Sequence, residues 1–248
     1  MKTFATFLFL LAVGALVFFT WGWLSAPGAA DNYFNRTWRP RLDHSVTLRN
    51  IFGLHDDGDA RYDYLGSRYK NIVLEVDSME QLLPDKEVLQ ELAAKIQKVT
   101  GKPTEYKLSD IDLPQEFSNG DQTLVRSAAS YQNYRSGGDT AYVYLLVLSQ
   151  EPGSQLLIGK TLNEDGIILY ESALKEFTAN HPNTQPNYEL STALHEFGHQ
   201  LGLAHNDKPG CLMSSHAESG DQAKSDPYLV LTDFCEFEVG QIKSMVIQ

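Results

Sequence analysis

Two histidines and a glutamate stand at spacings that suit a metal site. His195 and His199 are four residues apart, so in an α-helix their imidazoles project from one side on successive turns. Both can then reach a single ion at about 2.0–2.1 Å, the distance that tetrahedral zinc requires. Glu196 lies about 100° round the helix from His195, near enough to reach a water bound to that ion. Its carboxylate is suited to take a proton as the water attacks a carbonyl and to return it to a leaving amine.

The residues after this stretch extend the predicted site. Gly202 adopts a positive φ at little cost, so the helix can end there and the chain can turn back. His205, three residues later, is then placed to supply a third nitrogen. Three protein ligands leave one coordination position for water, which is typical of a catalytic zinc site. The histidines without such spacing are interpreted as surface residues: His44, His55, His181 and His216.

A helix must position these ligands, and it is predicted to start at Pro186-Asn187, where Asn187 can cap it. Its apolar residues recur three and four positions apart and are expected to face the core. These residues are Leu190, Leu194, Phe197 and Leu201.

Upstream, short β-prone runs alternate with amphipathic ones, which predicts a mixed sheet with helices packed on it. The predicted strands are 71–76, 104–108, 141–148 and 166–170, and the predicted helices are 85–99 and 121–134. Residues 141–148 are almost wholly apolar, as expected for a central strand buried on both faces.

The chain is uncharged from Phe4 to Leu24. A membrane-spanning helix needs about 20 apolar residues and a secretory signal roughly 7–15, so the length favours an anchor. Gly28-Ala29-Ala30 nevertheless offers small residues where a signal peptidase could cut. Residues 1–30 are therefore a signal peptide or a membrane anchor, and both predict an exported protein, either single-pass with an external catalytic domain or secreted.

Residues 31–70 have no sustained period and are predicted to be a spacer or short pro-segment. The acidic run His55–Asp59 does not match the spacing of a calcium loop and is interpreted as a solvated turn. Residues 71–248 are predicted to form the catalytic domain.

Composition sets broad limits on the class of protein. Hydrophobic content of 42% and charged content of 21% are typical of a globular domain. The net charge of -12 excludes nucleic acid and anionic lipid as expected partners, while the oligomeric state is undetermined. The two cysteines, Cys211 and Cys235, predict one disulfide in an exported chain, with two free thiols or one zinc ligand as alternatives.

The motif His195-Glu196-x-x-His199-x-x-Gly202-x-x-His205, followed by Met213, resembles the metzincin signature. The resemblance implies a zinc-dependent endopeptidase with Zn²⁺ as cofactor and Met213 packed beneath the metal. The implied fold is α+β, of the α/β metzincin type: a twisted, mixed, mostly parallel sheet packed with helices. An active-site helix and a small C-terminal subdomain after the third histidine complete it.

The subfamily stays open at this point. The spacing from His205 to Met213 is similar to that of matrixins, whereas Cys211, two residues before the methionine, resembles adamalysins and implies pairing with Cys235. No cysteine precedes residue 211, so the cysteine-switch latency of matrixins is absent. Ser215 stands where astacin-like members place a tyrosine.

Phe52 and Gly58-Asp59 faintly resemble an aspartate-based latency switch, but their spacing does not match that of such a switch.

The same resemblance implies a protein or peptide substrate, extended along an edge strand formed by Gly159–Leu162 or Gly166–Tyr170. Leu194 and the segment after Met213 would line the pocket beside the scissile bond. Two alternatives are a zinc amidase acting on cell-wall peptide and an inactive zinc-binding ectodomain. Glu196 disfavours the inactive form, because a structural site needs no base.

Overall fold

The computed structural model describes residues 2–29, 31–79, 82–109, 131–149, 157–206, 208–214 and 230–246. Most of the helix predicted over 121–134 lies outside the described residues, as do Ser215 and His216.

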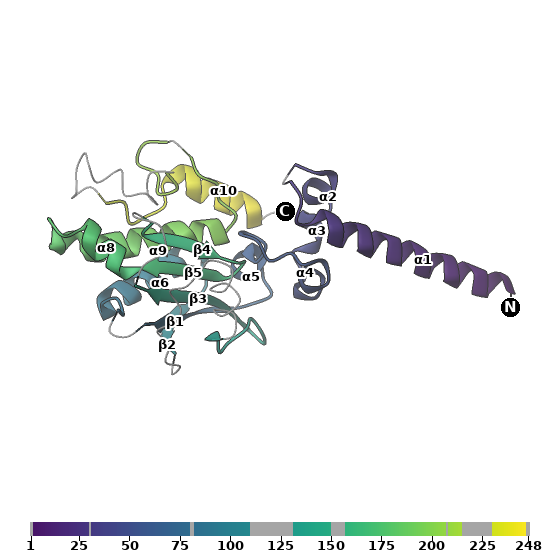
Figure 1. Ribbon diagram of the computed structural model, residues 1–248, viewed down its shortest axis with the longest axis horizontal. Helices are drawn as coiled ribbons and strands as arrows, with labels where there is room; N and C mark the ends of the chain where they lie inside the picture. The colour runs from purple at the N-terminus through teal and green to yellow at the C-terminus, as the bar shows by residue number, and fades with distance from the viewer. Residues whose placement is uncertain are drawn as a thin grey trace.

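One five-stranded sheet, ordered β2-β1-β3-β5-β4, forms the centre of the molecule (Figure 1). Its strands are β1 (Asn71–Ser78), β2 (Thr104–Leu108), β3 (Thr140–Leu148), β4 (Gly159–Leu162) and β5 (Gly166–Tyr170). The first three pairs are parallel, and β4 runs antiparallel to β5 at the edge. The predicted mixed, mostly parallel sheet is therefore confirmed. β3 is central and almost entirely buried, as its apolar run predicted.

Helices α6 (Lys86–Thr100) and α9 (Gln185–Gln200) pack on one face of this sheet. The amphipathic pattern over 85–99 correctly predicted α6, which ends where Gly101 takes a φ of 72°. The core beneath these helices joins side chains from both layers: Leu74, Leu145, Leu89, Leu92, Leu194 and Phe197.

The opposite face carries a second apolar cluster, with α8 (Glu171–Phe177) packed beside β3. The turn η2 (Pro182–Thr184) leads into α9, and α10 (Glu236–Val246) lies near the end of the chain. The C-terminal part after His205 is small, as the resemblance implied.

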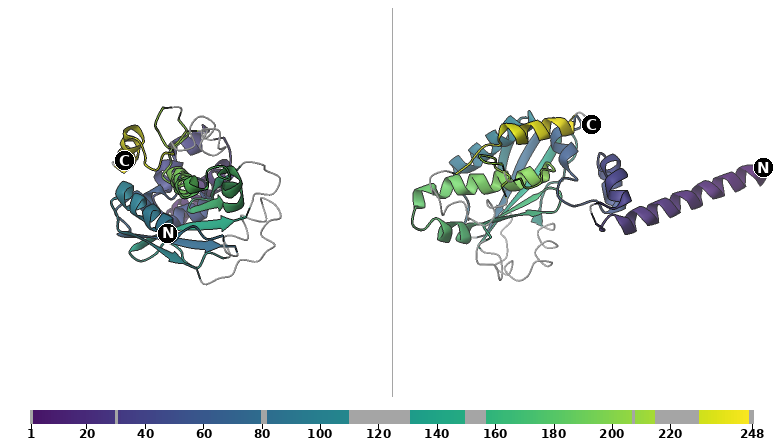
Figure 2. Two further views of the ribbon diagram at one scale, coloured as in Figure 1. Left: turned by 90° about the vertical axis from the view of Figure 1, so that its left-hand side faces the viewer. Right: turned by 90° about the horizontal axis from the view of Figure 1, so that it is seen from above.

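Helix α1 (Lys2–Ser25) projects away from the rest of the chain (Figures 1 and 2). Its stretch Thr3–Ser25 is long and apolar enough to cross a membrane, and its most apolar window is entirely unburied. Three short helices lie at its base: α2 (Tyr33–Thr37), α3 (Arg39–Leu42) and α4 (Val46–Phe52). We call these three helices the collar.

The chain between the collar and β1 contributes to the main core. It includes α5 (Arg61–Leu65), whose Tyr64 is fully buried with its ring 5.5 Å from that of Phe197. The hydroxyl of Tyr64 donates to the carbonyl of Tyr142 at 3.2 Å. Residues 31–70 therefore hold four helices and supply core side chains, and their role as spacer or pro-segment stays a prediction.

Candidate active site

The end of α9 turns the chain back toward the helix. Gly202 has a φ of 85°, and its N–H donates to the carbonyl of His199 at 2.8 Å. The N–H of Leu203 donates to the carbonyl of Gly198 at 3.0 Å. This pair of bonds is the Schellman arrangement, which satisfies the last helical carbonyls and reverses the chain. His205 is thereby brought beside the two histidines of the helix.

The three imidazoles meet through their Nε2 atoms. His205 Nε2 lies 3.2 Å from His195 Nε2 and 3.1 Å from His199 Nε2. The Nδ1 atoms of the helical histidines lie 2.8 Å from the carbonyl of Leu212 and 2.9 Å from that of Leu203. A carbonyl only accepts, so Nδ1 is the donor in both contacts, and in the neutral imidazole Nε2 then offers its lone pair.

Converging lone pairs repel unless a cation lies between them. Four ligands at 2.0–2.1 Å around tetrahedral zinc stand about 3.3–3.4 Å apart, close to the separations of His205 from its two neighbours. The three side chains also form a potential metal-binding group by proximity alone. The donor set and its spacing therefore fit a divalent cation of the zinc type.

Glu196 is placed in the same cleft. It is 1% exposed and lines a cavity of about 340 Å³ together with His199 and His205. Strand β4 approaches closely, because a Cβ on Gly159 would lie 3.5 Å from Glu196 Oε1 and 2.2 Å from Thr192 Cγ2. Only glycine allows the strand and the helix this near to each other.

Met213 lies under the active-site helix. A Cβ on Gly198 would meet its Sδ at 2.3 Å, and the methionine is completely buried. The N–H of Asn206, next to the third histidine, donates to the Met213 carbonyl at 2.7 Å. The methionine turn and the third histidine are thus joined through the backbone.

The sequence analysis missed Glu238, which holds this turn from α10. Its buried carboxylate accepts from the N–H groups of Leu212 at 3.1 Å, Met213 at 2.7 Å and Cys235 at 2.9 Å. It also accepts from Asn206 Nδ2 at 3.0 Å. No motif surrounds this residue, so only a predicted buried face of α10 could have pointed to it.

Cys211 and Cys235 form a disulfide with a Cα–Cα distance of 4.9 Å. The bond ties the methionine turn to the segment before α10. Free thiols and a cysteine zinc ligand, the two alternatives, are therefore excluded.

The structure also corrects the interpretation of the acidic run of residues 55–59. Asp59 is 2% exposed and binds Arg39 Nε at 2.8 Å, so the interpretation as a solvated turn is wrong for it. Asp57 lines the cleft beside Glu196, and its Oδ2 accepts from Thr161 Oγ1 at 3.0 Å. Burial raises the pKa of Asp57, while the Thr161 hydrogen bond and the nearby His199 lower it.

His44 and His55 lie outside the cluster. His44 stacks on Tyr62 with ring centroids 3.5 Å apart, and burial lowers its pKa. His55 contacts the carboxylate of Glu164, which raises the pKa of the imidazole.

Of the two candidate edge strands, Gly159–Leu162 is the edge, because Gly166–Tyr170 lies between β3 and β4. Leu194 is buried in the core, and the segment after Met213 is described only as far as Ser214. The proposed lining of the substrate pocket stays a prediction.

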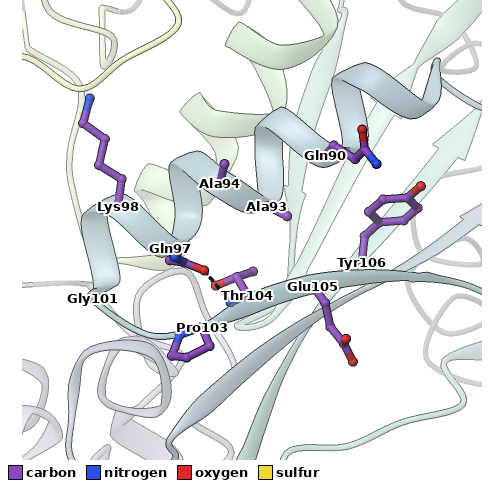
Figure 3. A pocket seen from close by; sticks show the side chains of 10 residues that line it. All are labelled: Gln90, Ala93, Ala94, Gln97, Lys98, Gly101, Pro103, Thr104, Glu105 and Tyr106. Atoms are coloured by element: carbon purple, nitrogen blue, oxygen red, sulfur yellow. Dashed lines mark hydrogen bonds between the residues drawn. The ribbon is translucent and has the colours of Figure 1, made fainter.

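A larger cavity, of about 660 Å³, lies between α6 and β2 (Figure 3). It is an open groove beside Gln97 and Thr104. The backbone N–H of Thr104 donates to Gln97 Oε1 at 3.2 Å. None of the site residues lines it. Size alone therefore does not identify the active site here.

Comparison with known proteins relates one segment of the sequence to a family and the fold to solved structures. Residues 149–228 match the matrixin family. The fold is similar to the crystal structure of archaemetzincin from Methanopyrus kandleri, with a TM-score of 0.53 at 15% identity over 74% of this chain and 100% of that chain. A zinc-dependent peptidase from Methanocorpusculum labreanum has a TM-score of 0.46 at 18% identity over 71% of this chain and 100% of that one. No curated protein matches the chain.

The fold, the histidine cluster and the matrixin match together define a metallopeptidase. More particularly, the matrixin match over residues 149–228 and the three clustered histidines are similar to those of the metzincin superfamily of zinc metalloproteases. The matched peptidase family implies protein substrates.

Proposed function

We propose that the protein is a zinc-dependent endopeptidase held at the outer face of a membrane. The convergence of three imidazole Nε2 atoms in one cleft with Glu196 carries this proposal. His195, His199 and His205 would hold the ion, which supplies Lewis acidity and lowers the pKa of water to about 7.

The chain's own residues supply the remaining chemistry. Glu196 is the general base that takes a proton from the attacking water and, once protonated, the general acid that passes it to the leaving amine. Strand β4 pairs with the backbone of an extended substrate, since it lies at the edge of the sheet next to Glu196. The carbonyls of Leu203 and Leu212 favour the tautomer in which the Nε2 lone pairs of two imidazoles point at the metal position.

The test compares Glu196→Ala with the wild-type protein on casein and on peptidoglycan. We expect the variant to retain zinc and to lose about 10²–10⁴-fold in kcat, the usual contribution of a positioned acid–base group. Asp233→Asn, a surface change beside Lys95 and Lys98, is the control and should keep full activity. Full activity in Glu196→Ala would contradict the assigned role. Cleavage of peptidoglycan without casein would favour a cell-wall amidase.

We further propose that α1 remains attached as a membrane anchor. The chain after α1 is folded against the collar: Asn35 Nδ2 donates to the carbonyls of Ala26 at 3.2 Å, Gly28 at 3.1 Å and Ala29 at 3.2 Å. Gly22 lies against the ring of Phe52, with room for no side chain. These contacts cover the small residues in the folded chain and would hinder their cleavage once the collar has folded, which supports retention.

Mass spectrometry of the mature N-terminus tests the anchor directly. We expect Lys2–Ser25 in the membrane-extracted protein, and a mature chain that begins near residue 31 would show a cleaved signal instead. Asn35→Ala, which removes the contacts to the three carbonyls, should increase cleavage at this site. Asn50→Ala, a change on α4 away from those carbonyls, is the matched control.

A further inference from the structure

Besides Glu196, one more carboxylate among the described residues lines the catalytic cleft. Asp57 comes from the loop between α4 and α5 and faces the same cavity as His199 and His205. Resting on the proposed peptidase function, we propose that Asp57 selects substrates that carry a basic side chain, lysine or arginine, close to the scissile bond.

The backbone that carries Asp57 is held firmly. The next residue, Gly58, is buried with a φ of 80°, and a Cβ there would lie 2.8 Å from Gly202 Cα. The carbonyl of Gly58 accepts from Arg61 Nη1 at 2.7 Å. With its carboxylate also bonded to Thr161, Asp57 is ordered before any substrate arrives, which lowers the entropy cost of binding.

The charge of Asp57 is available to a ligand. Its neighbours Asp56 and Asp59 are both engaged by Arg39 Nη2 at 2.6 Å. Within the described parts of the chain, Asp57 has a hydroxyl partner and no ion pair with a lysine or arginine. A substrate ammonium or guanidinium group would complete the pair, and the net charge of -12 favours the approach of basic substrates.

The cavity wall is not uniformly acidic, because Lys160 lines it as well. Successive side chains of a strand point to opposite faces, so the side chains of Lys160 and Thr161 lie on opposite faces of β4. A substrate side chain that lies along the face of Thr161 therefore meets Asp57.

The position of the selected side chain follows from β4. Gly159 lies against Glu196, and Thr161, the partner of Asp57, is two residues further along the strand. A strand rises about 3.3 Å per residue, so Asp57 acts about 6–7 Å from the catalytic carboxylate along β4. An extended peptide would present to it the side chain about two residues from the scissile bond.

The experiment uses the full chain, zinc-loaded in detergent, and quenched peptides with one cleavable bond. A single Lys, Gln or Glu is moved through the four positions on each side of that bond. We expect Lys to raise kcat/KM about fivefold over Gln at one position, mainly through KM, and Glu to lower it. Asp57→Asn should remove the preference and Asp57→Lys should invert it.

Binding without turnover gives a second readout. In the Glu196→Ala protein, fluorescence anisotropy should show tighter binding of the Lys peptide than of the Gln peptide, and adding Asp57→Asn should abolish the difference. Asp56→Asn removes the same charge one residue away, from a side chain that does not line the cavity. The Asp56→Asn variant should therefore still bind the Lys peptide more tightly than the Gln peptide.

Several results would overturn the proposal. Equal kcat/KM for Lys and Gln peptides at every position in the wild-type protein refutes selection while leaving the peptidase function intact. A uniform acceleration of all peptides by Asp57→Asn shows that Asp57 obstructs the cleft instead of selecting. Cleavage of no peptide by the wild-type protein refutes the proposed function itself, and selection with it.

Discussion

The end of α9 is supported from two sides that differ in chemistry. The C-terminal support comprises Cys211–Met213, Cys235 and Glu238, and uses a disulfide and a buried carboxylate bonded to backbone N–H groups. The N-terminal support comprises residues 56–63 and uses the backbone of Gly58 against Gly202, backed by ion pairs.

The ion pairs of the N-terminal support join three arginines, one each from α3, α4 and α5, to three carboxylates within residues 43–63. Arg61 binds Asp43 at 2.7 Å, Arg49 binds Asp63, and Arg39 binds Asp59. Burial raises the pKa of Asp43 and of Asp63 in the N-terminal support, so the free energy that these carboxyls contribute to folding depends on pH, whereas that of the disulfide does not. We therefore expect the ligand geometry to depend mainly on the C-terminal support and the pH dependence of stability on the N-terminal one.

The largest effect is expected from Glu238→Ala. The substitution leaves buried N–H groups of Leu212 and Met213 without an acceptor, at about 1–3 kcal/mol each. We expect a loss of about 4 kcal/mol in the free energy of unfolding, together with loss of bound zinc, measured by denaturant titration and metal analysis. Glu236→Ala, an exposed change two residues earlier on α10, should have little effect. Retained zinc and stability in Glu238→Ala would remove this residue from the support.

Removal of the disulfide tests the covalent part of the same support. The bond closes a sequence separation of 24 residues, so the Cys211→Ser, Cys235→Ser double variant should lose about 3 kcal/mol by the chain-entropy estimate. Thermal unfolding with and without reductant measures it: reductant should destabilise the wild-type protein and leave the double variant unchanged. Equal stability of both proteins would show that Glu238 alone maintains the turn.

Gly58→Ala tests the N-terminal support through its backbone contact. The new Cβ would overlap Gly202 Cα at 2.8 Å and displace the turn that precedes His205. Gly53→Ala is a matched control, because Gly53 has a φ of 66° and nothing within 4 Å of the added atom. Both variants carry the strain of a left-handed residue, so we expect Gly58→Ala to lose about 2 kcal/mol more and to bind zinc more weakly. Equal losses would show that the contact is unimportant.

The smallest expected effect is the pH dependence of the free energy of unfolding that results from the titration of Asp43. Burial raises the pKa of this carboxyl to about 6 against the opposing charge of Arg61, so the folded protein holds the proton more tightly than the unfolded chain. Its contribution to stability is present below about pH 4 and is lost as the pH rises through 6.

Asp43→Asn should remove this contribution. Relative to the variant, the wild-type protein should lose about 1 kcal/mol of unfolding free energy between pH 5 and pH 7, as denaturant titrations at both pH values would show. Asp139→Asn, an exposed carboxylate paired with Lys70, should leave the wild-type pH dependence intact. An unchanged pH dependence in Asp43→Asn would place the titrating group elsewhere.

Local patterns in the sequence were sufficient for the elements whose signal is periodic or stereochemical. The apolar run of β3 and the stripe of α6 predicted both correctly, because burial on two faces and on one face leave different patterns. Helical geometry alone is enough to predict from their spacing that His195 and His199 project from one side of a helix. The edge strand was left open between two segments, because sheet order depends on pairings distant in the sequence.

The chemistry of the donors could be predicted from local sequence: three histidines, a glutamate, and a glycine at which the helix can end. Tertiary structure alone decided which distant groups meet them. Glu238 reaches the methionine turn from α10, and Asp57 reaches the cleft from a loop more than a hundred residues upstream of the helix. Neither carboxylate has a local pattern, because its role depends on contacts between segments that only the packed fold brings together.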